Sequence, residues 1–187
     1  MSNPVHLICY YPITLIKHKF MDTFLPPIER PAGWMMKLAY FFTRKQFGKV
    51  LMPLKVHSAR LPAAFGMFYG KISALDKKML LPAETALLVR QQVARINVCA
   101  FCIDASRLAW IRKGMNSAKF DALDYATELT KEKSVRAETF ERLSKFYSER
   151  EICEIVYLIA SEHVYNLTNI GLNIHSDMLC DITKKPR

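Results

Sequence analysis

Glycine is scarce in this chain of 187 residues. It occurs six times, where an average usage of about 7% would give roughly 13. The sequence also contains no G-x-G-x-x-G, Walker, G-x-S-x-G or H-E-x-x-H motif. The common nucleotide-binding enzymes, α/β hydrolases and zinc peptidases therefore find no support, and a turn-dense β-sandwich is disfavoured.

Long apolar runs are missing too. No uncharged apolar run approaches the roughly 18 residues that span a bilayer, and the longest candidate, residues 5–16, contains a histidine, two tyrosines and a proline. It has no basic segment before it and no small-residue cleavage site after it, so we expect neither a membrane span nor a secretory signal. We expect residues 1–22 to be a loosely packed N-terminal extension and residues 23–187 to form a single domain. The expected location is the cytoplasm, where paired cysteines are usually catalytic or metal-binding.

The composition is that of a folded domain with a basic surface. Hydrophobic residues make up 51% of the chain and charged residues 24%, enough for a full core, and the formal net charge is +10. The basic residues occur in small groups without interleaved aromatics, and no zinc-finger or RNP motif is present. We interpret these groups as solvated surface and expect no nucleic-acid partner.

Apolar residues recur at three- and four-residue spacing along most of the chain after Pro31. The spacing predicts helices over about 31–48, 63–75, 82–96, 99–113, 117–129 and 137–146, with a prolyl connection over 53–62. Ser148 and Glu151 form a capping-box pattern that predicts the start of a last long helix reaching Ile170. No window alternates with period two, so the expected fold is all-α, a helical bundle with long central helices.

The first predicted helix carries an unusually aromatic stripe. Trp34, Phe41 and Phe42 share one face of it. Because large exposed apolar patches usually mark contacts, we expect the stripe to pack in the core or to join subunits of a closed homo-oligomer.

Cys99 and Cys102 are separated by two residues, a spacing that fits one helical turn and allows a disulfide. At a helix N-terminus the partial positive charge favours thiolate, which attacks peroxides and disulfides while a second cysteine resolves the adduct. Two alternatives stay open. The pair could be buried and inert, or it could be half of a zinc site, although the other cysteines and the histidines form no second close pair. We expect no metal and no cofactor.

The stretch Leu87–Asp104, which includes Cys99-Ala100-Phe101-Cys102, resembles the core motif of the carboxymuconolactone decarboxylase family, which includes alkylhydroperoxidase D. Residues 151–160 and 165–169 also resemble the last long helix of that family, so the similarity covers about residues 47–180. The resemblance implies an alkylhydroperoxidase D-like all-helical fold, trimers or hexamers, and thiol-dependent reduction of a peroxide or a disulfide with a thiol reductant. It also implies that Cys102 attacks and that Cys99 resolves.

Two positions depart from the peroxidase branch of the family. That branch has a glutamate where this chain has Leu87 and a histidine where it has Ser106. The base that assists the thiol is therefore expected elsewhere, with Glu84, one turn before Leu87, and His163, on the last helix, as the candidates. Ser106 remains a candidate hydrogen-bonding group.

The first hypothesis for function is thus a thiol–disulfide oxidoreductase or a weak alkylhydroperoxide-reducing antioxidant protein. The alternatives are a non-catalytic oligomeric protein of the same fold and a decarboxylase-type enzyme that acts on a small molecule.

Overall fold

The computed structural model describes residues 23–113 and 121–179, and all regular secondary structure in these two ranges is helical. The elements in chain order are α2 (Trp34–Phe47), η1 (Leu54–Ser58), α3 (Pro62–Phe65), η2 (Gly66–Ile72), α4 (Ser73–Asp76), α5 (Ala83–Ile96), α6 (Ala100–Lys113), α7 (Asp121–Glu132), α8 (Ala137–Ser144) and α9 (Glu149–Gly171). The predicted all-α class is confirmed. The proposed extension over residues 1–22 lies outside the described residues.

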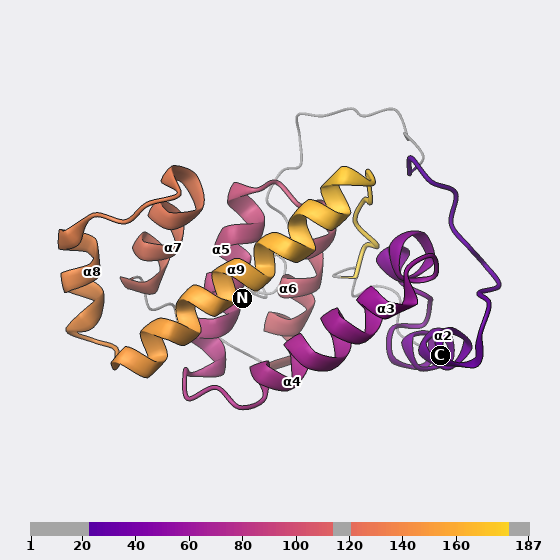
Figure 1. Ribbon diagram of the computed structural model, residues 1–187, viewed down its shortest axis with the longest axis horizontal. Helices are drawn as coiled ribbons and strands as arrows, with labels where there is room; N and C mark the ends of the chain where they lie inside the picture. Colours follow the sequence, from indigo (N-terminus) through magenta and orange to yellow (C-terminus); the bar gives the residue numbers. More distant parts are fainter. Residues whose placement is uncertain (1–22, 114–120, 180–187) are drawn as a thin grey trace, which may run out of the picture.

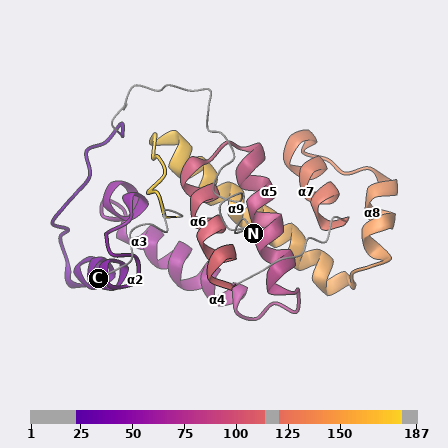
Figure 2. The ribbon, with the colours of Figure 1, turned by 180° about the vertical axis from the view of Figure 1, so that it is seen from behind.

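The centre of the molecule is formed by α5, α6 and α9. In Figure 1, α9 crosses in front of α5 and α6, and Figure 2 shows the same crossing from behind. The helices α7 and α8 lie at one end of the molecule and α2 at the other. Val89 and Val93 of α5 pack with Ile155 and Ile159 of α9 in a fully buried cluster. This cluster fixes the two central helices against each other.

The capping box that the sequence predicted is present at the start of α9. The backbone N–H of Ser148 donates to Glu151 Oε2 at 2.9 Å, and the Ser148 side chain accepts from the backbone N–H of Glu151. Two backbone amides at the start of the helix, those of Ser148 and Glu151, are thereby satisfied without a tertiary partner. Across the described residues, no helix is both long and apolar enough to cross a membrane.

The aromatic stripe on α2 faces outward. Trp34 is 77% exposed, and Phe41 and Phe42 are also exposed, while Met36 and Tyr40 bury the opposite face of the helix. Gly48 ends α2 in the left-handed conformation at φ 74°, as its position in the sequence predicted. Within this chain the stripe is therefore not part of the core.

The prolyl stretch between residues 53 and 62 differs from the prediction of a plain connection. Pro53 precedes a π-helical turn, η1, because a proline is tolerated at the start of a helical segment, where its missing N–H has no partner to lose. A second π-helical segment, η2, joins α3 to α4, so residues 62–76 form one irregular helical run.

Most side chains of this irregular run are exposed or half-buried. Among the side chains described in residues 62–76, Phe68 alone is fully buried. Two tyrosine hydroxyls of α9 donate to its backbone: Tyr165 to the carbonyl of Phe68 and Tyr157 to the carbonyl of Ile72, each at 3.0 Å. The run thus lies against α9 through polar contacts and a single large apolar anchor.

Candidate active site

The turn between α5 and α6 places the cysteine pair. The N–H of Cys99 donates to the carbonyl of Ala94 at 3.0 Å, and the N–H of Val98 donates to the carbonyl of Arg95 at 3.2 Å. These two bonds form a Schellman motif, in which the residue after the helix cap is left-handed and usually glycine. Here that residue is Val98, with φ 56°. A β-branched side chain in this conformation is strained, and the strain lies directly before Cys99.

Replacing Val98 with glycine should therefore stabilise the protein. Val98 is 73% exposed, so the substitution removes little packing, while the left-handed conformation costs an L-residue about 1–2 kcal/mol. Glycine loses more backbone entropy on folding, so we expect a net gain of about 0.5–1 kcal/mol in the free energy of unfolding. Urea unfolding followed by circular dichroism measures it. A loss of stability in Val98→Gly would contradict the account of strain at this turn.

Cys99 and Cys102 form a disulfide with a Cα–Cα distance of 5.3 Å. Cys99 precedes Ala100, the first residue of α6, and its carbonyl accepts the N–H of Ile103 at 2.9 Å. The Cys99 sulfur accepts the backbone N–H of Cys102 at 3.4 Å, as a capping side chain does. The helix N-terminus therefore favours a thiolate on Cys99 when the disulfide opens.

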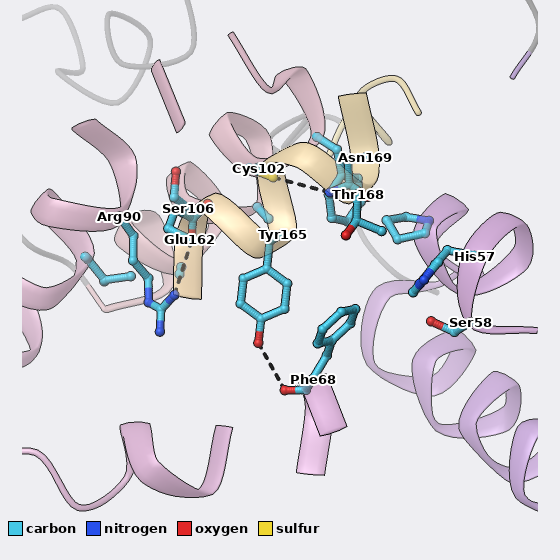
Figure 3. Close-up of a pocket in the computed structure, with 15 residues that line it drawn as sticks. His57, Ser58, Phe68, Arg90, Cys102, Ser106, Glu162, Tyr165, Thr168 and Asn169 are labelled. Carbon is cyan, nitrogen blue, oxygen red and sulfur yellow. Dashed lines mark hydrogen bonds and ion pairs between the residues drawn. The ribbon is translucent and has the colours of Figure 1, made fainter. Parts of the chain in front are cut away.

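A cavity of about 260 Å³ opens beside this disulfide. Cys102 is among its lining residues and Cys99 is not; Cys99 is 1% exposed. Asn169 of α9 donates from Nδ2 to the Cys102 sulfur at 3.3 Å, a contact drawn in Figure 3. A molecule in the cavity thus meets the sulfur of Cys102 first, while Cys99 lies behind it.

Some of the site residues predicted from the sequence line the cavity and others do not. Ser106 lines the cavity, as does Leu87, so the two positions that depart from the peroxidase branch both face the same space as Cys102. Glu84, in the first turn of α5, and His163 are not among the lining residues. Their assignment as bases stays a prediction.

His163 nevertheless belongs to a hydrogen-bonded chain that reaches the cavity. Asn97 Nδ2 lies 3.0 Å from Nδ1 of His163 and donates to Oδ1 of Asn166 at 2.9 Å, and Asn166 donates to Oε1 of Glu162 at 2.7 Å. Burial, together with the charge of Lys133, lowers the pKa of His163, which favours a neutral ring that accepts from Asn97. The buried end of the chain is Glu162.

Glu162, a carboxylate in the cavity wall, was not among the candidates predicted from the sequence. It is buried, lines the cavity and lies beside Arg90, whose Nη1 is 3.2 Å from its Oε2. Burial raises the pKa of Glu162, against the opposing effects of the Arg90 charge and the hydrogen bond from Asn166. The helical periodicity could have marked Glu162, since it follows Ile155 and Ile159 by seven and three residues on the buried face of α9. Its position in the cavity wall could not be predicted, because that depends on helices remote in sequence.

His57 on η1 is the second titratable group that the sequence did not single out. Figure 3 shows His57 and Phe68 on one side of Tyr165, with Glu162 and Arg90 on the other. The His57 ring stacks on Phe68 with centroids 5.7 Å apart, and Phe68 meets Tyr165 edge-on at 5.8 Å. Burial lowers the pKa of His57. This side of the cavity is an aromatic wall, suited to an apolar or planar ligand.

Within the part of the chain that the structure describes, no metal-ligating cluster accompanies the cysteine pair. In residues 23–113 and 121–179, no three His, Cys, Asp or Glu side chains converge as ligands would. Cys153, on the exposed face of α9, carries a free thiol.

The sequence of this chain is similar to that of a known protein. No protein-family profile matches the chain. An uncharacterised protein of Escherichia coli K12, YnjA, is 24% identical over an alignment 182 positions long, and the match covers 86% of this chain and 94% of YnjA.

Three solved structures share the architecture. The debrominase Bmp8, solved as a cysteine-to-alanine variant with 2,3,4-tribromopyrrole, covers 87% of this chain and 96% of its own at a TM-score of 0.68 and 19% identity. The match to a peroxidase-related protein of Silicibacter sp. covers 81% of this chain and 90% of that protein, with a TM-score of 0.64 and 18% sequence identity. The third is a protein of unknown function from Agrobacterium tumefaciens, provisionally assigned as the antioxidant defence protein AhpD. The match covers 64% of this chain and 94% of that protein, with a TM-score of 0.57 and 19% sequence identity.

The chain has the AhpD-like fold. The resemblance that the cysteine motif carried is thus confirmed at the level of the fold. In this AhpD-like chain the disulfide lies at the N-terminus of α6, between α5 and α9.

Proposed function

We propose that this AhpD-like protein is a thiol-dependent reductase of hydroperoxides, which passes through the Cys99–Cys102 disulfide and is reloaded by a dithiol. The observation that carries the proposal is the asymmetry of the pair: Cys102 lines the cavity and Cys99 does not. The Cys102 thiolate attacks the distal oxygen of the hydroperoxide, the O–O bond breaks, and an alkoxide leaves to be protonated to an alcohol. Cys99 then displaces water from the sulfenic acid, closing the disulfide.

The return step uses the same asymmetry. A thiolate of the reductant reaches the Cys102 sulfur from the cavity, and the S–S electron pair departs with Cys99. The Cys102 amide and the N-terminus of α6 stabilise that leaving thiolate, because the Cys99 sulfur already accepts the amide in the disulfide form. A second thiol of the reductant releases Cys102, so each cycle consumes one dithiol. We propose that this cycle runs in the cytoplasm, where dithiol reductants are kept reduced.

The experiment is a thiol count after a peroxide pulse. Reduced protein receives one equivalent of cumene hydroperoxide, and free thiols are titrated under denaturing conditions. We expect two thiols to be lost for each cumyl alcohol formed, with a Cys99–Cys102 disulfide in the peptide map. Thiols that persist after the pulse would favour the non-catalytic alternative.

A second candidate, reductive dehalogenation of an aromatic compound, is favoured by the aromatic wall of His57, Phe68 and Tyr165. The solved Bmp8 complex holds a brominated pyrrole in a protein of the same fold. In that reaction the two thiols supply two electrons and two protons: the C–Br bond becomes C–H, the disulfide closes, and bromide and a proton are released. Bromide release from 2,3,4-tribromopyrrole by the reduced protein, matched by thiol loss, would select this candidate over the first.

We also propose that the chain assembles into a closed homo-oligomer, a trimer or a hexamer. The support is the exposed apolar face of α2, formed by Trp34, Leu38, Phe41 and Phe42. Sedimentation velocity should give a mass above 21.6 kDa at micromolar concentration. The double substitution Trp34→Asp with Phe41→Asp should lower that mass, whereas Phe140→Asp, at an exposed position of α8 at the other end of the molecule, should not. A monomeric wild type would refute the assembly.

A further inference from the structure

The positions that the peroxidase branch fills with a glutamate and a histidine hold Leu87 and Ser106 in this chain, and both line the cavity. Leucine takes up no proton, and a serine hydroxyl is a poor base near neutral pH. The Ser106 hydroxyl already donates to the carbonyl of Ile103 at 2.9 Å. The cavity wall must therefore supply a base from another position if the thiol is to be deprotonated on the protein.

We propose that Glu162 is this base: it accepts the proton of the Cys102 thiol and returns it to the departing alkoxide. The inference rests on the proposed thiol chemistry. Glu162 comes from α9, whereas both missing groups of the branch would come from α5 and α6. The same face of α9 carries Glu162, Tyr165 and Asn169, spaced three and four residues apart, and all three line the cavity. Asn169 contacts the Cys102 sulfur directly, and Glu162 lies two turns of α9 before it, about 10 Å along the helix, so it is the shared cavity that connects Glu162 with the sulfur.

The charge balance around Glu162 suits proton uptake. Arg90 is shared by two carboxylates: its Nη2 lies 2.9 Å from both oxygens of Asp76, and its Nη1 lies 3.2 Å from Glu162. Two carboxylates therefore share one guanidinium, which leaves the cluster with one uncompensated negative charge when both are ionised. Glu162 is the more deeply buried of the two, so its negative charge is the more costly one. A proton on Glu162 makes the cluster neutral, which a buried site favours.

The hydrogen bonds of Glu162 leave room for that proton. Arg90 and Asn166 occupy one acceptor position on each carboxylate oxygen, and an ionised carboxylate has about four. The other titratable groups of the cavity wall are His57 and Tyr165. The Tyr165 hydroxyl already donates to the carbonyl of Phe68. His57 lies on the far side of Tyr165 and is the one competitor for the role among the residues that line the cavity.

The proton that Glu162 takes from Cys102 is the one that it returns to the leaving alkoxide. The Cys102 S–H proton moves through the cavity, which both residues line, to a Glu162 oxygen as the sulfur attacks the peroxide. The O–O bond breaks, Cys102 becomes a sulfenic acid, and the alkoxide takes the proton from Glu162 to leave as an alcohol. Glu162 is again a carboxylate, and no proton has to come from bulk water.

The test is the pH profile of the first peroxide step, measured by stopped-flow fluorescence on the reduced protein. In wild type the rate constant should already be near its plateau at pH 7. In Glu162→Gln the thiol must ionise by itself, with a pKa of about 8.5, so the rate constant at pH 7 should fall about 30-fold. The two proteins should converge above about pH 9.5, where thiolate forms without a base. A merely structural role would lower the rate equally at every pH.

Matched variants keep the result interpretable. Glu162→Asp, which retains a carboxylate, should restore much of the neutral-pH rate, and Glu141→Gln, on the exposed side of α8, should match wild type. If His57→Gln loses the neutral-pH rate and Glu162→Gln keeps it, the base is His57 and the proposal is wrong. The ionisation of Cys102 needs no peroxide, and the difference in absorbance at 240 nm between Cys99→Ser and the double variant Cys99→Ser with Cys102→Ser measures it. If no variant reacts with peroxide but this absorbance still depends on Glu162, the reductase proposal fails while the pairing of Glu162 with Cys102 stands.

Discussion

Serine in place of Cys102 is expected to reduce hydroperoxide turnover to the uncatalysed background, because the cavity then presents no sulfur to the substrate. Serine in place of Cys99 should also stop turnover, but only after one equivalent of alcohol has formed, since attack needs Cys102 alone and resolution needs both. The stalled sulfenic acid on Cys102 can be trapped with dimedone and located by mass spectrometry.

The third cysteine of the described region provides the control. Cys153 is exposed on α9 and does not line the cavity, so Cys153→Ser should retain the wild-type rate. Equal single-turnover yields from Cys99→Ser and Cys102→Ser would contradict the assignment of attacking and resolving roles.

Truncation of Leu158 to alanine is expected to be the most destabilising of the substitutions considered. Leu158 is 1% exposed and packs in the cluster that joins α5 to α9. Loss of its transfer free energy, together with the cavity left behind, should lower the free energy of unfolding by about 2–5 kcal/mol.

The same helix offers a matched control. Leu167→Ala removes the same atoms from a side chain that is 65% exposed, and it should change the free energy of unfolding by less than about 0.5 kcal/mol. Urea unfolding followed by circular dichroism at 222 nm measures both. Similar losses in the two variants would mean that Leu167 is covered in solution, for example by another subunit.

Local signals predicted the helices well because each signal is contained in a few neighbouring residues. The capping box at Ser148 and the glycine stop at Gly48 were both readable in this way, and both are present. The spacing of Cys99 and Cys102 likewise placed the pair at a helix start, where it lies. These features depend on backbone hydrogen bonding over one turn, which the sequence specifies directly.

The cavity could be predicted only in part. Cys102 and Ser106 face it because they share one helix face, but Glu162 and His57 arrive there from α9 and η1 through tertiary packing. The π-helical turns that carry His57 and Phe68 shift side chains away from the period of 3.6 on which the sequence analysis relied. Predictions from periodicity fail at such positions, which are common near functional sites.

The limited burial of residues 62–76 has a consequence for how the cavity exchanges its contents. Amide protons of α5 and α9 should be protected up to the global unfolding free energy, because their apolar faces form the main core. Amides of η2 should exchange through a separate, lower-energy opening, since release of two tyrosine hydroxyls, of Phe68 and of the Asp76–Arg90 ion pair frees that run from α9 and α5. Passage of substrate and product would then be set by the opening frequency of one wall, while the helices that hold the cysteines stay closed.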